Sequence, residues 1–159
     1  MPIILKIDEP PFDVDIVELV DGQISATILI GSDEDRGINY FSEAVLSPYD
    51  EDCPEYSFAI IAHDVVENTY TTFMSGLKTA ELFSRDDRET ILSAICWATQ
   101  ELLNFAQPQK VYRCTHDVRP PDKAVEKHHM ISVVFAACGY KVARCNDWHG
   151  QRVWIAERV

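Results

Sequence analysis

The sequence predicts an α+β protein with three layers, in which an N-terminal antiparallel meander leads into a mixed central sheet with two main helices. Up to about residue 74, apolar and polar residues alternate with the period of half-buried strands. From residue 84 onward, two stretches repeat apolar residues at helical spacing, and strand-like segments follow each of them. Because a strand–helix–strand order requires crossover connections, we expect parallel strands in the sheet and helices on its faces.

The meander contains several predicted strands separated by turn-forming residues. Asp21-Gly22 is a strong two-residue hairpin turn, and Ser32 to Gly37 forms the next turn. Pro48 and Pro54 then interrupt the alternation before an apolar, partly β-branched segment that fits a central strand. Strands are expected at about residues 13–20, 24–30, 38–46, 56–65 and 70–74.

The first predicted helix spans about residues 86–106. Ser84 with Asp87 three residues later resembles a capping box, and the acids of the first turn complement the positive end of a helix. Apolar residues recur at helical spacing along this segment, and Pro108 stops it. A short strand is expected directly afterwards, at about residues 110–115.

The second predicted helix follows the proline-containing segment 119–122 and runs to Cys138. Gly139 ends it, because only glycine enters the left-handed conformation at little cost, and Tyr140 folds back onto the last turn. No repeat or linker divides the chain, so we expect residues 1–159 to form a single domain. The last two strands are expected at about residues 141–145 and 152–157.

The composition is that of an ordinary soluble globular protein. The chain has 159 residues, of which 47% are apolar and 25% charged, enough for one domain to bury a core. Its start lacks the basic flank and long apolar run of a secretion signal, and no window is apolar enough for a membrane span. Five scattered cysteines, an odd number, favour reduced thiols in the cytoplasm over a disulfide framework.

Negative charge is concentrated in the first half of the chain. The net charge is −12, and residues 1–80 contain sixteen acidic against three basic side chains. Residues 81–159 contain ten acidic against eleven basic side chains. An electrostatic field of this sign opposes binding to nucleic acid and suits a cationic substrate or a basic protein partner. The alternative interpretation is that the acids lie in solvated loops and keep the protein soluble.

The run Phe135-Ala136-Ala137-Cys138-Gly139-Tyr140-Lys141-Val142 leads from a helix through a glycine and an aromatic residue into a strand. This run, together with the order of predicted elements in the C-terminal half, resembles the GNAT fold of N-acetyltransferases. The resemblance implies transfer of an acyl group from a coenzyme A thioester such as acetyl-CoA to an amine. One part of the family pattern is missing, since residues 74–85 contain one glycine and no Gly-x-Gly pair to cradle the coenzyme pyrophosphate.

Binding of coenzyme A would require backbone amides and cationic side chains near the start of the first helix. The residues that offer such groups around the missing loop are Gly76, Lys78, Ser84, Arg85 and Arg88. The alternative is an ordinary capped helix whose cationic side chains are solvated.

Cys114, His116 and Asp117 lie at the end of a predicted strand, where open α/β sheets place their ligands. Together with His128 or His129 of the following helix, they are compatible with a thiol nucleophile activated by an imidazole, or with a zinc site. The chain has neither a Cys-x-x-Cys nor a His-Glu-x-x-His spacing, so we predict no metal. The simplest alternative is a buried thiol beside an exposed imidazole and a turn carboxylate.

Two functional hypotheses follow. The first is a GNAT-like acyltransferase acting on a cationic amine, in which His63, His116 or Tyr140 serves as the base or the acid. The second is a non-catalytic acidic module that binds or inhibits a basic protein. The enzyme requires a cleft between two splayed parallel strands near Ser84, whereas the module needs only a patch on the meander and has that cleft filled by side chains.

Overall fold

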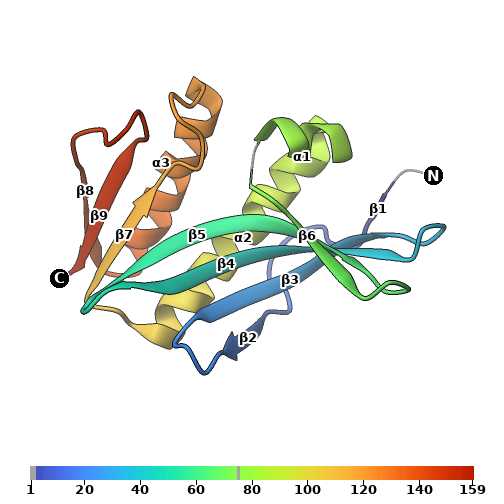
Figure 1. The fold of residues 1–159 in the computed structure, drawn as a ribbon, viewed down its shortest axis with the longest axis horizontal. Coiled ribbons are helices and arrows are strands. Elements are labelled where there is room, and N and C mark those ends of the chain that lie inside the picture. The colour runs from blue at the N-terminus through green and yellow to red at the C-terminus, as the bar shows by residue number, and fades with distance from the viewer. Residues whose placement is uncertain (1–2, 75) are drawn as a thin grey trace.

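The computed structural model describes residues 3–74 and 76–159 of the chain. Within these residues the fold is α+β, as predicted: one mixed sheet of nine strands carries three helices (Figure 1). No helix in the described residues is long and apolar enough to cross a membrane. All five cysteines are free thiols.

The predicted meander is present. Its strands are β1 (Ile4–Leu5), β2 (Asp15–Glu18), β3 (Ile24–Asp33), β4 (Ile38–Asp50), β5 (Cys53–Asp64) and β6 (Thr69–Phe73). Asp21-Gly22 forms the predicted turn, in which Gly22 has a φ of +92° and its amide donates to the Leu19 carbonyl over 3.0 Å. The sequence pattern does not predict β1, because two residues are too few to show an alternation.

The second half alternates helices and strands, as predicted. Its elements are α1 (Gly76–Leu82), α2 (Arg85–Ala106), β7 (Lys110–Cys114), α3 (Asp122–Ala137), β8 (Tyr140–Arg144) and β9 (Val153–Arg158). Gly139 has a φ of +94° and forms the predicted junction between α3 and β8. The sequence pattern misses α1, because about two helical turns are too short to repeat an apolar face.

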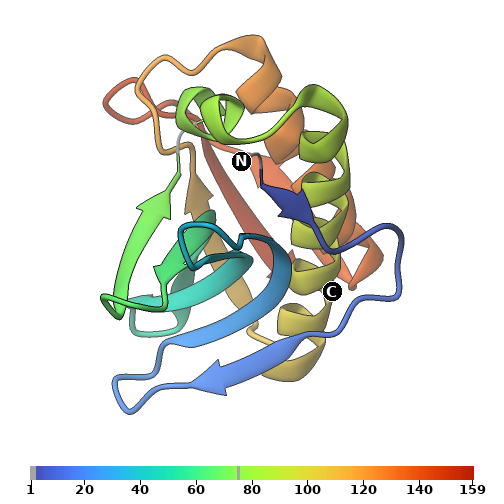
Figure 2. The same cartoon turned by 90° about the vertical axis from the view of Figure 1, so that its right-hand side faces the viewer.

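The helices described here all lie on one face of the sheet, where the sequence predicted helices on both faces (Figure 2). The strand order is β1-β3-β4-β5-β7-β9-β8, so the chain advances in one direction from β5 to β7 and then to β8. Right-handed crossovers that advance in one direction leave their helices on the same face. The molecule therefore has two layers instead of the predicted three.

The core lies between the sheet and this helical layer. Tyr56 of β5 is fully buried, and its hydroxyl is 2.5 Å from the Thr99 hydroxyl of α2. Phe135 of α3 packs edge-on against both Tyr56 and Tyr140, with ring centroids 5.4 and 5.6 Å apart. These contacts join α2 and α3 through the middle of the sheet.

β5 and β7 are parallel neighbours that separate almost at once. They pair at one position, Glu55 with Tyr112. Farther along, β5 pairs with β6 from Ile60 to Asp64. Between these two pairings, residues 56–59 pair with β4 alone in the described structure, so their other edge is open. The sheet is therefore split at this point between two parallel strands.

Candidate functional site

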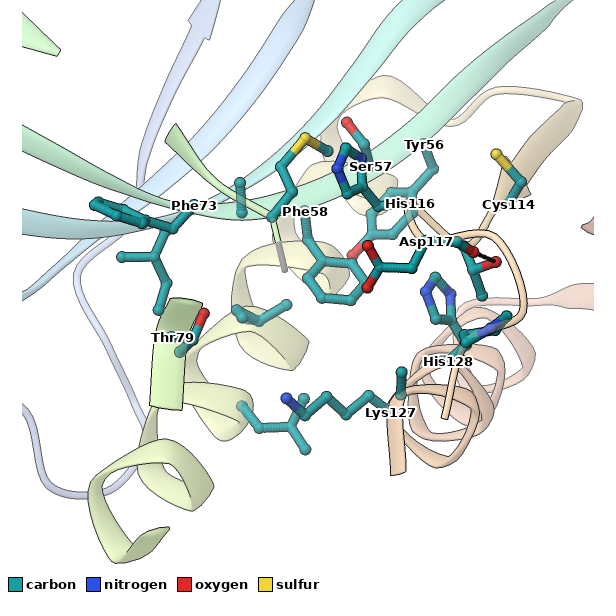
Figure 3. Close-up of a pocket in the computed structure, with 18 of the residues that line it drawn as sticks. Tyr56, Ser57, Phe58, Phe73, Thr79, Cys114, His116, Asp117, Lys127 and His128 are labelled. Atoms are coloured by element: carbon teal, nitrogen blue, oxygen red, sulfur yellow. Dashed lines mark hydrogen bonds between the residues drawn. The ribbon is translucent and has the colours of Figure 1, made fainter. Parts of the chain in front are cut away.

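A cavity of about 200 Å³ occupies the split between β5 and β7. Residues 55–60 of β5 form one wall, and residues 114–117, at and after the end of β7, form the opposite wall. The helical layer closes the cavity with residues from the N-terminal halves of α2 and α3 and with Thr79 of α1 (Figure 3). The structure thus contains a cavity between two splayed parallel strands, although Ser84, near which the enzyme hypothesis expects the cleft, does not line it.

Two cationic side chains, Arg88 of α2 and Lys127 of α3, line this cavity. Within the described residues, neither of them forms an ion pair with a carboxylate. The Nε atom of Arg88 is buried and has no hydrogen-bond partner in this part of the chain. Burial lowers the pKa of Lys127, and the neighbouring positive charge of Arg88 lowers it further. An anionic group in the cavity would give the Arg88 guanidinium a partner.

His128 of α3 also lines the cavity and is 8% exposed. Its ring stacks on Trp154 at 4.9 Å and lies 5.3 Å from the ring of Phe58. Burial, and then the charge of Arg113, lower its pKa to about 3, so the imidazole is neutral at physiological pH. Its Nδ1 atom is buried without a hydrogen-bond partner among the described residues.

Arg113 does not line the cavity but contacts His128, which does. Its guanidinium, 2% exposed, lies between the rings of Phe135 and Trp154, 5.1 and 5.0 Å from their centroids. It donates to the His128 carbonyl over 3.0 Å and to the Ser132 hydroxyl. Burial lowers the pKa of Arg113 only to about 10, so it stays charged at neutral pH. This positive charge adds to burial, the larger cause, in keeping the His128 imidazole neutral.

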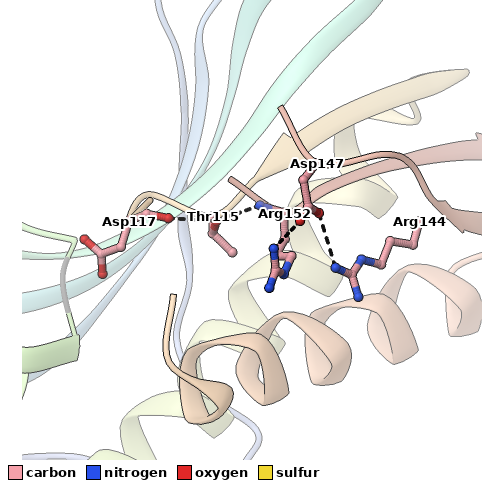
Figure 4. Close-up of polar contacts among 5 residues, drawn as sticks. All are labelled: Thr115, Asp117, Arg144, Asp147 and Arg152. Carbon is pink, nitrogen blue, oxygen red and sulfur yellow. Dashed lines mark hydrogen bonds and ion pairs between the residues drawn. The ribbon is translucent and has the colours of Figure 1, made fainter. Parts of the chain in front are cut away.

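The rim of the cavity is a loop held by polar contacts to the segment between β8 and β9. The Thr115 hydroxyl donates to the Asp117 carbonyl and accepts from the Arg152 amide, over 3.1 Å in each case (Figure 4). Asp147 pairs with the guanidinium groups of both Arg144 and Arg152. Thr115 thus joins the loop that carries His116 and Asp117 to the segment before β9.

Of the predicted catalytic residues, His116 alone lines the cavity. His63 lies at the far end of β5, where its ring stacks on Tyr70 at 4.3 Å and its Nε2 is 3.1 Å from the Asn68 side-chain oxygen. Tyr140 is buried, and its hydroxyl donates to the Pro108 carbonyl over 2.5 Å. The structure does not bring His63 and Tyr140 to the cavity.

Of the predicted phosphate-binding residues, Arg88 alone lines the cavity. Arg85 is exposed and pairs with Glu89 over 4.0 Å, and the Lys78 side chain is also exposed. Gly76 is the first residue of α1. Ser84 caps α2, and its hydroxyl accepts from the Asp87 amide over 3.2 Å, as the capping pattern predicts.

Replacing Ser84 by alanine is expected to lower the free energy of unfolding by about 1 kcal/mol, because the Asp87 amide loses its acceptor. Urea denaturation followed by circular dichroism measures this loss. Ser84→Asp is the matched control, because aspartate also caps helices and should keep most of the stability. Equal losses in the two variants would show that the hydroxyl does not act as the cap.

Neither alternative for Cys114 gains support. Burial raises the pKa of its thiol, which disfavours the nucleophilic thiolate. The described residues contain no group of three or more His, Cys, Asp or Glu side chains arranged to hold a metal ion. His129 is exposed and meets Trp154 edge-on at 6.4 Å.

The sequence analysis misses the cavity residue Lys127 and treats His128 only as a companion of Cys114. A usable signal is present for the lysine. Lys127 precedes Ile131 by four residues and Phe135 by eight, so it lies on the inward face of α3. A lysine on an inward face is unusual, because its charge must be desolvated.

Comparisons with protein-family models, with curated proteins and with solved structures find no match for this chain.

Proposed function

We propose that this protein is a GNAT-like acyltransferase that moves an acyl group from a coenzyme A thioester to a cationic amine. The observation that carries the proposal is the cleft between the parallel strands β5 and β7. It combines an open strand edge with a cationic side chain, Arg88, that has no acidic partner among the described residues. The order of elements and the Phe135–Val142 run support the same assignment.

The thioester arm of coenzyme A contains two amide groups, and these match the open edge of β5. Residues 56–59 present backbone donors and acceptors on that edge, and an extended amide chain can pair with them as an added strand would. At the helical end of the cleft, Arg88 offers the phosphates its guanidinium, whose Nε has no hydrogen-bond partner among the described residues. The missing glycine-rich loop makes this side chain the main phosphate ligand.

The acceptor amine must lose a proton before it attacks the thioester. His116, exposed on the rim loop and lining the cavity, is the candidate base. Glu55 lines the same cavity and provides a negative charge that favours a cationic acceptor. The excess of acids in residues 1–80 acts in the same direction over a longer range.

The test is thermal unfolding with and without acetyl-CoA. A ligand at about 100 times its dissociation constant stabilises the folded protein by about 2.7 kcal/mol, which raises the melting temperature by roughly 2–4 °C in a domain of this size.

Arg88→Gln should weaken the binding of acetyl-CoA by about 10- to 100-fold, because a hydrogen bond from a charged group contributes about 1.5–3 kcal/mol. Arg85→Gln is the matched control on the same helix and should bind normally.

An unchanged melting temperature in the wild-type protein contradicts the proposal, and so does equal weakening by the two arginine substitutions. The second candidate is then a non-catalytic module that binds a basic protein, favoured by the face of the sheet on which none of the described helices lies. On that face, Glu43 is half-buried and its pKa is raised by burial. A titration with a lysine-rich peptide at low and high salt tests this candidate.

A further inference from the structure

We infer that Lys127 is an acyl acceptor inside its own cavity: its Nζ atom takes the acyl group of a bound thioester and forms a stable amide. The reaction modifies a side chain of the protein itself, and the modified cavity would bind a further thioester less tightly. The identity of the thioester as a coenzyme A derivative rests on the proposed function. The reactivity of the amine rests on the cavity alone.

The geometry places an amine where a thioester would lie. Lys127 extends from α3 across the cavity toward α2 (Figure 3). Its side chain is half-buried, and no carboxylate within the described ranges forms an ion pair with it. The aromatic ring of Phe58 and the apolar side chains of α2 also line the space. A lysine enclosed in this way is held next to any ligand that enters.

Burial and the positive charge of Arg88 favour the neutral, nucleophilic form of Lys127. The charged or titratable groups that line the cavity with it are Arg88 on α2, His128 on α3, His116 and Asp117 on the rim loop, and Glu55 on β5. Burial is the main cause that lowers the pKa of Lys127, and Arg88 is the second. Desolvation and a neighbouring cation are the two conditions that activate lysine nucleophiles in enzymes.

The chemical step is balanced by the groups that are present. The neutral amine attacks the carbonyl carbon of the thioester, and a carbon–nitrogen bond forms. The carbon–sulfur bond then breaks, and the proton lost by the amine neutralises the departing thiolate, either directly or through water. The products are an amide on Lys127 and a free thiol, and no oxidant or other reactant is required.

Acylation would alter the cavity in two ways. The amide has no charge, so the pair of cations formed by Arg88 and Lys127 is reduced to one. The added acyl group also fills part of a space of only about 200 Å³. Both changes weaken the binding of a second thioester, so acylation of Lys127 would reduce the activity of the site.

The experiment compares two acyl donors by peptide mass spectrometry over time. One is acetyl-CoA, and the other is the acetyl thioester of N-acetylcysteamine, which carries no nucleotide. We expect both to acetylate Lys127 about tenfold faster than Lys123, which is exposed on the same helix. Lys127→Arg keeps the charge and removes the nucleophile, so it should abolish the fast reaction, whereas Lys123→Arg should not change it.

The outcomes separate this inference from the proposed function. A higher melting temperature with acetyl-CoA but no fast reaction of Lys127 with either donor overturns the inference and leaves the acyltransferase proposal standing. Fast reaction with the small thioester alone supports the reactive lysine and counts against coenzyme A as the donor. Equal rates at Lys127 and Lys123 overturn the inference whichever donor is used.

Discussion

Replacing Phe135 by alanine is expected to lower the free energy of unfolding by about 3–5 kcal/mol. Phe135 is fully buried and, with Ile131, joins α3 to the core. Its ring packs edge-on against Tyr56 and Tyr140 and forms one side of the cage around the guanidinium of Arg113. Truncation therefore leaves a cavity and also removes one of the two rings that stabilise a buried charge.

Urea denaturation of the purified variant measures this loss. Phe105→Ala on α2 is the matched control, since Phe105 is 55% exposed and its truncation should cost much less. Phe135→Leu keeps most of the volume and should recover part of the stability. Similar losses at positions 105 and 135 would contradict the central place of Phe135 in the core.

The second large effect is a loss of stability in acid that depends on His128. Its pKa is about 3 in the folded protein and about 6.5 in the unfolded chain. Between these values the unfolded state binds a proton that the folded state does not, so stability falls as the pH falls below about 6.5. The maximum slope is about 1.4 kcal/mol per pH unit, and the integrated loss is about 2 kcal/mol between pH 7.5 and pH 5.

The measurement is the free energy of unfolding at pH 7.5, 6.5 and 5. His128→Leu should remove the contribution of the imidazole, so its stability should change less than that of the wild-type protein over this interval. His129→Leu is the matched control, because His129 is exposed and its replacement should leave the slope unchanged. Parallel curves for the wild type and His128→Leu would show that this imidazole can be protonated without unfolding the protein.

The sequence predicts the elements of this fold well because their signals are local. The alternation of β3, β4 and β5, the Asp21-Gly22 turn and the cap at Ser84 each lie within a few residues of the chain. The placement of the helices is a different kind of property. It depends on the direction in which the chain crosses the sheet, and no local pattern records that direction.

The site is harder to predict for the same reason. The sequence analysis selects Arg88 and His116, both of which line the cavity, because a charge near a helix start and an imidazole at a strand end are local signals. The cavity itself arises where β5 exchanges one partner strand for another, which depends on pairing between distant segments. Arg113 shows a further limit, since a basic residue on a short strand gives no sign that two aromatic rings enclose it.

The single pairing between β5 and β7 has a consequence for the order in which the protein is made. Residues 4–106, which include β1 to β6 and α2, leave the ribosome before β7 does. Until residues 110–114 arrive, the edge of β5 near Glu55 has no strand beside it, and an open edge of this kind can pair with another chain. One pairing position with β5 gives little hold by itself, whereas β7 pairs along its whole length with β9. We therefore expect the edge of β5 to stay open to strand exchange until the last third of the chain has been made.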